Sequence, residues 1–266
     1  MVVATIPIDG DLALARAELA TQRLVALLRG VVDPDKVAIG EWSIAQLSTH
    51  LADVYERYPT LVRGEPSPIE SAEGLAPYSA AVVAANPDPD LRSLAARIDV
   101  GIAEYAAGVQ EAGHDRPVKF HAGIEMPVAA LSCMALGEAV VHGRDIALAE
   151  GRPWTIDRDD AALVIKGVAH AIPAFLTQAG RASGDSFRLS LRGSDPLTLR
   201  FGGGRLEVTA VDEDPVDCRI SADPVAFLLL SYGRIGQLRP IATGKVVALG
   251  RKPWLGLRFK QLLMSP

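Results

Sequence analysis

Two residues near the middle of the chain, Glu138 and His142, are candidate metal ligands. They stand four residues apart in a long helical pattern, so on an α-helix both side chains face the same side. His50, on an earlier predicted helix, can supply a second imidazole. Two histidines and one carboxylate form a ligand set that suits zinc and leaves one coordination position open for chemistry. These residue types therefore predict a divalent-metal site, with zinc as the expected ion.

The same residues also allow a structural interpretation. A glutamate and a histidine at this spacing often form a surface ion pair, and a buried hydrogen bond between them can tie two helices together. Val140 and Val141 leave little polar surface around Glu138, and a carboxylate near a core needs a partner or a cation. Asp53 and Asp145 each follow a candidate histidine by three residues. They can orient the imidazole N–H groups or be ordinary surface charges.

The remaining histidines and cysteines are weaker candidates. We expect His114 to be solvated, and His121 to lie at the surface or to line the mouth of a site. His170 stands among apolar residues, as is typical of a core histidine. Cys133 falls five residues before Glu138 and therefore on a different helix face, so burial as a small apolar residue is its expected role.

The residues before position 183 predict a bundle of helices that would position these ligands. Apolar residues recur with the helical period over 11–30, 43–63, 75–85, 90–112, 127–151 and 157–179, the last bent at Pro173. Ser43, with Gln46 three residues later, is a capping-box pattern at the start of the helix that carries His50. We expect residues 116–126 to cross one end of the bundle.

After residue 184 the pattern changes to the alternation of half-buried strands. Strands are predicted over 187–191, 197–201, 206–211, 218–221 and 241–249, and helices over 225–232 and 253–263. Asp223 and Pro224 supply an N-cap and a first-turn proline for the first of these helices. The sequence thus predicts an α+β protein. A helical metal-binding bundle (1–182) is followed by a smaller α/β domain (185–266) with a mainly antiparallel sheet.

The composition excludes several classes of partner. Across 266 residues, 27 Lys and Arg stand against 32 Asp and Glu, and the basic residues are dispersed. Neither nucleic acid nor an acidic membrane is therefore an expected partner. No apolar run reaches membrane-spanning length, and residues 1–9 lack the features of a signal peptide. With two cysteines and no CxxC pattern, we expect a reducing, cytoplasmic location. The expected partner is a small molecule, and the expected assembly is a monomer or homodimer.

Four segments of the chain resemble the mycothiol-dependent maleylpyruvate isomerase family. They are Trp42 to Ala52, Gly123 to Pro127, Gly137 to Ala147 and Gly151 to Trp154. Their order and spacing match, and the resemblance implies a DinB-like four-helix bundle as the metal-binding domain. Residues 185–266 are similar to the family's C-terminal domain, which is related to sterol carrier protein type 2. The resemblance therefore covers nearly the whole chain.

The resemblance also implies a set of site residues and cofactors. His50, Glu138 and His142 would be the zinc ligands, and mycothiol, a low-molecular-weight thiol, would bind at the open coordination position. The family's C-terminal domain contributes an arginine to the active site. Arg234 is the expected residue here, with Arg239 close by as an alternative, and a solvated arginine without this role is the other interpretation.

The implied reaction is the addition of a metal-activated thiolate to an unsaturated diacid, followed by bond rotation and elimination of the thiol. The alkene would change from cis to trans. Transfer of the thiol onto an electrophile, as in a mycothiol S-transferase, is an alternative that the sequence leaves open. A third possibility is a protein that is not an enzyme. In it a metal-stabilised bundle would accompany a domain that binds a small apolar ligand or lipid against residues 227–230, although that apolar helix is also typical of a core.

Overall fold

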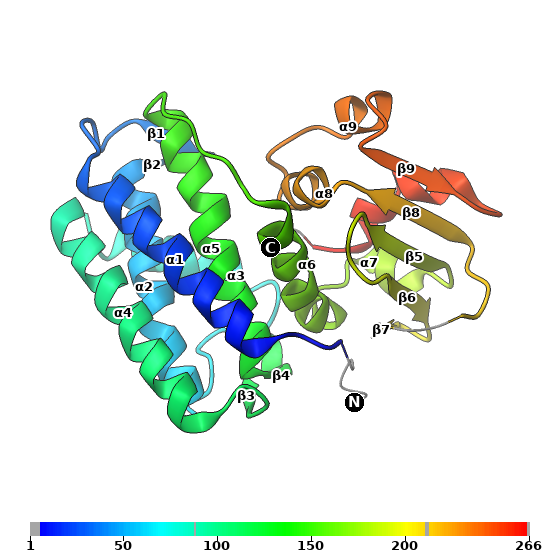
Figure 1. The fold of residues 1–266 in the computed structure, drawn as a ribbon, viewed down its shortest axis with the longest axis horizontal. Coiled ribbons are helices and arrows are strands. Elements are labelled where there is room, and N and C mark those ends of the chain that lie inside the picture. Colours follow the sequence, from blue (N-terminus) through cyan, green and yellow to red (C-terminus); the bar gives the residue numbers. More distant parts are fainter. Residues whose placement is uncertain (1–5, 88, 211–212, 265–266) are drawn as a thin grey trace. The chain divides into compact units, whose positions relative to one another are not determined.

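The computed structural model of the protein describes residues 6–87, 89–210 and 213–264. The chain divides into two compact units. The helical unit is Asp9–Ile156, and the sheet unit runs from Asp157 onward together with the described residues before Asp9. Figure 1 shows the helices and strands of both units. None of the helices in these ranges combines the length and the apolar character needed to cross a membrane.

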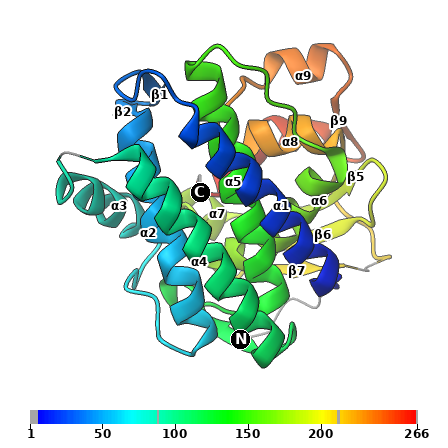
Figure 2. The ribbon, with the colours of Figure 1, turned by 60° about the vertical axis from the view of Figure 1, so that its left-hand side comes forward.

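The helical unit is built on a four-helix bundle, as predicted. Its long helices are α1 (Gly10–Arg29), α2 (Ile44–Val62), α4 (Leu91–Ala112) and α5 (Val128–Ala149). Helix α1 packs along α4 and α5, and α2 packs along the same two helices (Figure 1, Figure 2). The shorter α3 (Leu75–Ala84) packs on α2.

Two small hairpins complete the helical unit. Strand β1 (Val37–Ile39) pairs with β2 (Trp42–Ser43), and β3 (Pro117–Lys119) pairs with β4 (Glu125–Pro127) around the short helix η1 (His121–Gly123). The second hairpin occupies the segment that was expected to cross one end of the bundle. The β-forming residues of that segment therefore make a local hairpin.

A capping box sets the first turn of α2, as the sequence predicted. The Ser43 hydroxyl accepts from the Gln46 backbone N–H at 3.3 Å, and the Gln46 side chain accepts from the Ser43 backbone N–H at 2.9 Å. These reciprocal bonds satisfy two N–H groups that would otherwise lack a helical partner. The start of the helix that carries His50 is thereby defined.

Buried tyrosines hold the bundle helices in register. The Tyr55 hydroxyl of α2 contacts the Thr21 hydroxyl of α1 at 2.8 Å and donates to the Ala135 carbonyl of α5 at 2.9 Å. Tyr105 of α4 similarly contacts the Ser132 hydroxyl of α5 at 2.8 Å. Burial raises the pKa of both phenols above their usual range, so they remain neutral donors. The bond from Tyr55 to Ala135 links the two helices that carry the candidate ligands.

The sheet unit contains one five-stranded, mainly antiparallel sheet, as predicted. Its strands are β5 (Ser186–Leu191), β6 (Leu197–Gly202), β7 (Arg205–Thr209), β8 (Cys218–Ala222) and β9 (Val246–Leu249). Their order is β7-β6-β5-β8-β9, and only the β5–β8 pair is parallel among the described strands. Its helices are α6 (Arg158–Ala171), η2 (Ile172–Ala174), α7 (Gln178–Ala182), α8 (Pro224–Ser231), α9 (Leu238–Ala242), η3 (Pro253–Leu257) and η4 (Phe259–Leu262). Asp223 caps α8 by accepting from the Ala226 backbone N–H, as expected.

Some element boundaries differ from those expected. Residues 241–242 end α9, and a turn at Gly244 (φ 67°) precedes β9, so the fifth strand is shorter than predicted. The expected terminal helix is two short 3-10 segments. The third strand was expected to reach Val211, but the structure shows β7 to Thr209, and Val211 lies outside the described residues.

The two compact units separate before helices α6 and α7, earlier in the chain than the change from helices to strands. The sequence placed the boundary at residues 182–185, whereas the compact units separate between Ile156 and Asp157. Helix α6 belongs to the sheet unit because its Ile165 and Ala169 line an apolar cavity together with the strands and α8. Helical periodicity reveals that a face is apolar, but it does not say which core that face covers.

The backbones of helices α2 and α4 approach closely at Gly101, which gives a test of the bundle. A Cβ added at Gly101 would lie 2.7 Å from the Tyr55 carbonyl oxygen, whereas one added at Gly108 would meet the Val62 side chain at 3.4 Å. We expect Gly101→Ala to lower the free energy of unfolding by about 1–3 kcal/mol, because rigid backbone must move. Gly108→Ala should be neutral or stabilising by up to about 1 kcal/mol. Urea denaturation measures both, and equal effects would contradict the close approach.

Candidate metal centre

The structure brings the three predicted ligands together within the helical unit. His50 comes from α2, and Glu138 and His142 come from α5; one donor atom from each lies within 4.8 Å of the other two. Glu138 Oε2 is 3.4 Å from His142 Nε2 and 3.8 Å from His50 Nε2. Ligand atoms around a tetrahedral zinc ion lie about 3.4 Å apart, given bonds of about 2.0–2.1 Å. Small side-chain adjustments would therefore suffice to place all three around one ion.

The burial and the ionisation of the Glu138 carboxylate are consistent with a bound cation. Glu138 Oε2 is buried and has no hydrogen-bond partner among the described residues. Burial raises the pKa of the Glu138 carboxyl, but the two imidazoles and the charge of Arg57 outweigh burial and lower that pKa to about 2. The group is therefore an anion at neutral pH, in a place where an anion needs compensation. A buried hydrogen bond between His50 and Glu138, the structural alternative, is not formed at 3.8 Å.

One of the two expected supporting aspartates takes the predicted position. Asp145 is buried, and its Oδ2 lies 3.1 Å from His142 Nδ1, which leaves Nε2 of that ring facing Glu138. Such a carboxylate fixes the tautomer and the orientation of a metal-binding imidazole. Asp53 instead pairs with Arg57, four residues further along α2.

Two aromatic side chains flank the centre. The Trp42 ring centroid is 5.6 Å from that of His50. His121 stacks on Phe120 at 3.9 Å, and its Nδ1 lies 2.6 Å from the Ser67 hydroxyl. Burial, together with the charge of Arg57, lowers the pKa of His121 to about 3, although Glu138 acts in the opposite direction. His121 is therefore a neutral, half-buried residue near Glu138 and His50, and not the exposed surface residue that was one of the two expectations.

Arg57 was not predicted as a site residue. It follows His50 by seven residues and therefore lies on the same face of α2. Its side chain is only 12% exposed and pairs with Asp53 through Nη2. Its Nε and Nη1 are buried and have no hydrogen-bond partner among the described residues. The guanidinium carbon lies 4.8 Å from the centroid of the Tyr78 ring. The spacing from His50 was the signal in the sequence that could have identified it.

The other candidate residues lie apart from the ligands or in the sheet unit. Arg234 is half-buried in the sheet unit, where its Nη1 donates to the Tyr232 carbonyl at 2.6 Å, and Arg239 is exposed. Its assignment as the active-site arginine stays a prediction. His170 is a core histidine, as expected, with Nε2 3.2 Å from the Ile6 carbonyl oxygen. His114, expected to be solvated, is half-buried and contacts Asp11.

Comparison with known proteins identifies the family. The sequence model described as "Mycothiol maleylpyruvate isomerase N-terminal domain" matches residues 17–147, and the one described as "MDMPI C-terminal domain" matches residues 162–257. The two matches cover most of the chain and include all three candidate ligands. The chain therefore belongs to the mycothiol maleylpyruvate isomerase family, which is a family of enzymes. The resemblance noted in the sequence is confirmed.

Solved structures show the same fold over both units. A crystal structure of the mycothiol-dependent maleylpyruvate isomerase is 17% identical, covers 91% of this chain and 93% of its own, and has a TM-score of 0.55. A structure of a single-residue variant of that enzyme is 16% identical over the same shares, with a TM-score of 0.57. A search of curated proteins finds no match. At these identities the structural likeness shows a shared fold.

The contact between Asp145 and His142 generates a prediction about metal affinity. Asp145→Ala should weaken zinc binding by roughly 10- to 100-fold, because the imidazole loses the acceptor that orients it. Competition with a chromophoric chelator measures the affinity, and circular dichroism checks that the helices persist. Asp99→Ala is the matched control, since Asp99 lies on α4 and pairs with Arg29 at the surface. Unchanged zinc affinity in Asp145→Ala would remove Asp145 from the centre.

Proposed function

We propose that the protein is a zinc- and mycothiol-dependent enzyme that catalyses cis–trans isomerisation of a small unsaturated acid. The observation that carries this proposal is the convergence of two imidazoles on a buried carboxylate oxygen of Glu138 that has no hydrogen-bond partner among the described residues. Membership of the maleylpyruvate isomerase family supports the reaction class. The proposed partners are one small-molecule substrate and one low-molecular-weight thiol. A cytoplasmic location and a monomer or homodimer are part of the same proposal.

The proposed roles fall to the three metal ligands and to the residues that position them. His50, Glu138 and His142 would hold the ion, and three protein ligands leave a position open for a thiol sulfur. Asp145 keeps the His142 ring oriented, and the bond from Tyr55 to the backbone of α5 holds the two ligand-bearing helices together. When bound, zinc favours the thiolate form of a coordinated thiol, whose reversible addition to a conjugated double bond permits rotation about that bond.

Substrate binding would involve an arginine of the sheet unit. We assign this role to Arg234, because a planar guanidinium suits a carboxylate. A mycothiol S-transferase that acts on an electrophile would use the same thiolate and the same ligands. Turnover of maleylpyruvate by the zinc- and thiol-loaded protein favours the isomerase, whereas a stable thiol conjugate as the product favours the transferase.

Metal analysis of ligand variants tests the proposal. Wild-type protein should bind about one zinc ion per chain, and His50→Ala and Glu138→Gln should each lower zinc affinity by more than about a hundredfold, since each removes a direct ligand. The His114→Ala variant should retain wild-type affinity, because His114 contacts Asp11 away from the ligands. Titration of zinc-loaded protein with mycothiol then tests the open position. Equal zinc content in His50→Ala and wild type, or zinc binding without thiol binding, would contradict the proposal.

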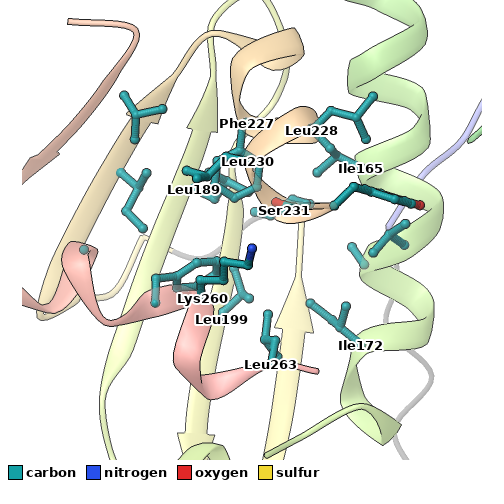
Figure 3. Close-up of a pocket in the computed structure, with 18 of the residues that line it drawn as sticks. Ile165, Ile172, Leu189, Leu199, Phe227, Leu228, Leu230, Ser231, Lys260 and Leu263 are labelled. Carbon is teal, nitrogen blue, oxygen red and sulfur yellow. The ribbon is translucent and has the colours of Figure 1, made fainter. Parts of the chain in front are cut away.

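A cavity in the sheet unit favours a second candidate function, the binding of a small apolar ligand. Figure 3 shows this cavity between α6, α8 and the sheet; its volume is about 110 Å³. Ile165, Leu189, Leu199, Phe227 and Leu228 are among the apolar side chains that line it. An engineered cavity of about 150 Å³ with similar walls stays dry and binds benzene. The predicted contact surface at residues 227–230 thus contributes to a real cavity, through three of its four residues.

Filling the cavity tests this second candidate. Ala169 of α6 lines the cavity, so Ala169→Leu should occupy part of it, whereas Ala107→Leu changes an exposed position of α4. With saturating benzene, the melting temperature of the wild type and of Ala107→Leu should rise by a few degrees, as expected for a ligand that binds only the folded state. Ala169→Leu should show no rise. A wild type that does not respond to benzene would exclude the cavity as a binding site.

A further inference from the structure

We propose that Arg57 binds a carboxylate group of the substrate beside the metal centre. This inference rests on the proposed function and deepens it, because it makes the helical unit itself selective for anionic substrates. It differs from the role assigned to Arg234, which lies in the other unit. Three features of Arg57 support it: the position of its guanidinium on α2, the donors that lack a partner among the described residues, and the neighbouring side chains.

The guanidinium points toward the metal ligands. Side chains on a helix lean toward its N-terminus, and the pairing of Arg57 with Asp53 shows this direction, because Asp53 lies one turn earlier. The charged group therefore sits near the level of Asp53, about 4.5 Å along the helix axis from His50 and on the same face.

Not all N–H donors of the Arg57 guanidinium are used in its pairing with Asp53. Asp53 accepts from Nη2, whereas Nε and Nη1 are buried and have no hydrogen-bond partner among the described residues. Burying N–H groups of a charged side chain without hydrogen-bond acceptors costs free energy. Such donors therefore suggest that an acceptor binds there. An incoming carboxylate oxygen would satisfy these donors with charge-assisted hydrogen bonds.

A purely structural role explains only part of this arrangement. Arg57 packs over the Tyr78 ring, and Tyr78 donates to Asp53 at 3.4 Å, so the three residues tie α3 to α2. That network uses one nitrogen and the flat face of the guanidinium. It leaves Nε and Nη1 unused. Another neighbour of Arg57, His121, is neutral near pH 7, because burial lowers its pKa to about 3, so it does not neutralise an incoming anion.

Calorimetric binding of two probes to the zinc-loaded protein tests the inference. Maleate carries two carboxylates, and dimethyl maleate has the same carbon skeleton without charge. We expect Arg57→Met to weaken maleate binding by roughly 10- to 100-fold, as for the loss of charge-assisted hydrogen bonds, and to leave dimethyl maleate unaffected. Arg57→Lys, which keeps the charge but not the planar fork, should lose roughly tenfold or less.

Controls separate this inference from the proposed function. Arg63→Met changes an exposed arginine at the end of the same helix and should bind maleate as the wild type does. Zinc and mycothiol affinities are measured on every variant. If Arg57→Met still binds zinc and thiol and its maleate affinity is unchanged, the inference about Arg57 is wrong and the proposed function is unaffected. If the wild type does not bind zinc, the proposed function itself is wrong.

A second measurement does not depend on the folding of a variant. In wild-type protein labelled with ¹⁵N-arginine, a buried guanidinium Nε–H exchanges slowly with water and is observable. Adding maleate should shift one such resonance, and adding dimethyl maleate should not. If maleate binds and no buried arginine resonance moves, the carboxylate does not contact Arg57.

Discussion

A carboxylate held inside a helical bundle is the constraint on which the centre of the helical unit depends. One oxygen of Glu138 is buried without a hydrogen-bond partner among the described residues, and the group stays ionised because two imidazoles and an arginine stand nearby. A buried charge persists only beside compensating charge. In a purely structural core this arrangement would be unfavourable. A divalent cation held by the carboxylate and the imidazoles would supply the compensating charge.

The surrounding helices supply the rigidity that such a centre requires. The Tyr55 hydroxyl bridges three bundle helices, and Gly101 lets α4 approach the backbone of α2 closely. Both features fix the helix that carries His50 and Arg57, and sites on packed helices hold their geometry better than sites on loops. The sheet unit has a different character, with an apolar cavity in its core and Arg234 after α8.

Features set by local backbone geometry were predictable from the sequence. The helical period identified the bundle helices, and alternation identified the strands. The capping box at Ser43, the N-cap at Asp223 and the shared helix face of Glu138 and His142 follow from spacing alone, and the structure bears them out. Choosing His50 as the third ligand also relied on the family resemblance. The family models match this chain over both units.

Only the tertiary structure decided which distant segments meet. The sequence pattern of the apolar face of helix α6 would be the same whether that face covered the bundle or the sheet. In the structure it packs with the sheet unit. Asp53 and Asp145 have the same spacing from a histidine, yet Asp145 meets its histidine and Asp53 meets Arg57. The sequence by itself determined the elements and the helix face on which each ligand lies, because these depend on neighbours along the chain. The burial of Arg57 donors that lack a partner in the described part of the chain was decided by side chains brought from other helices, which no local pattern encodes.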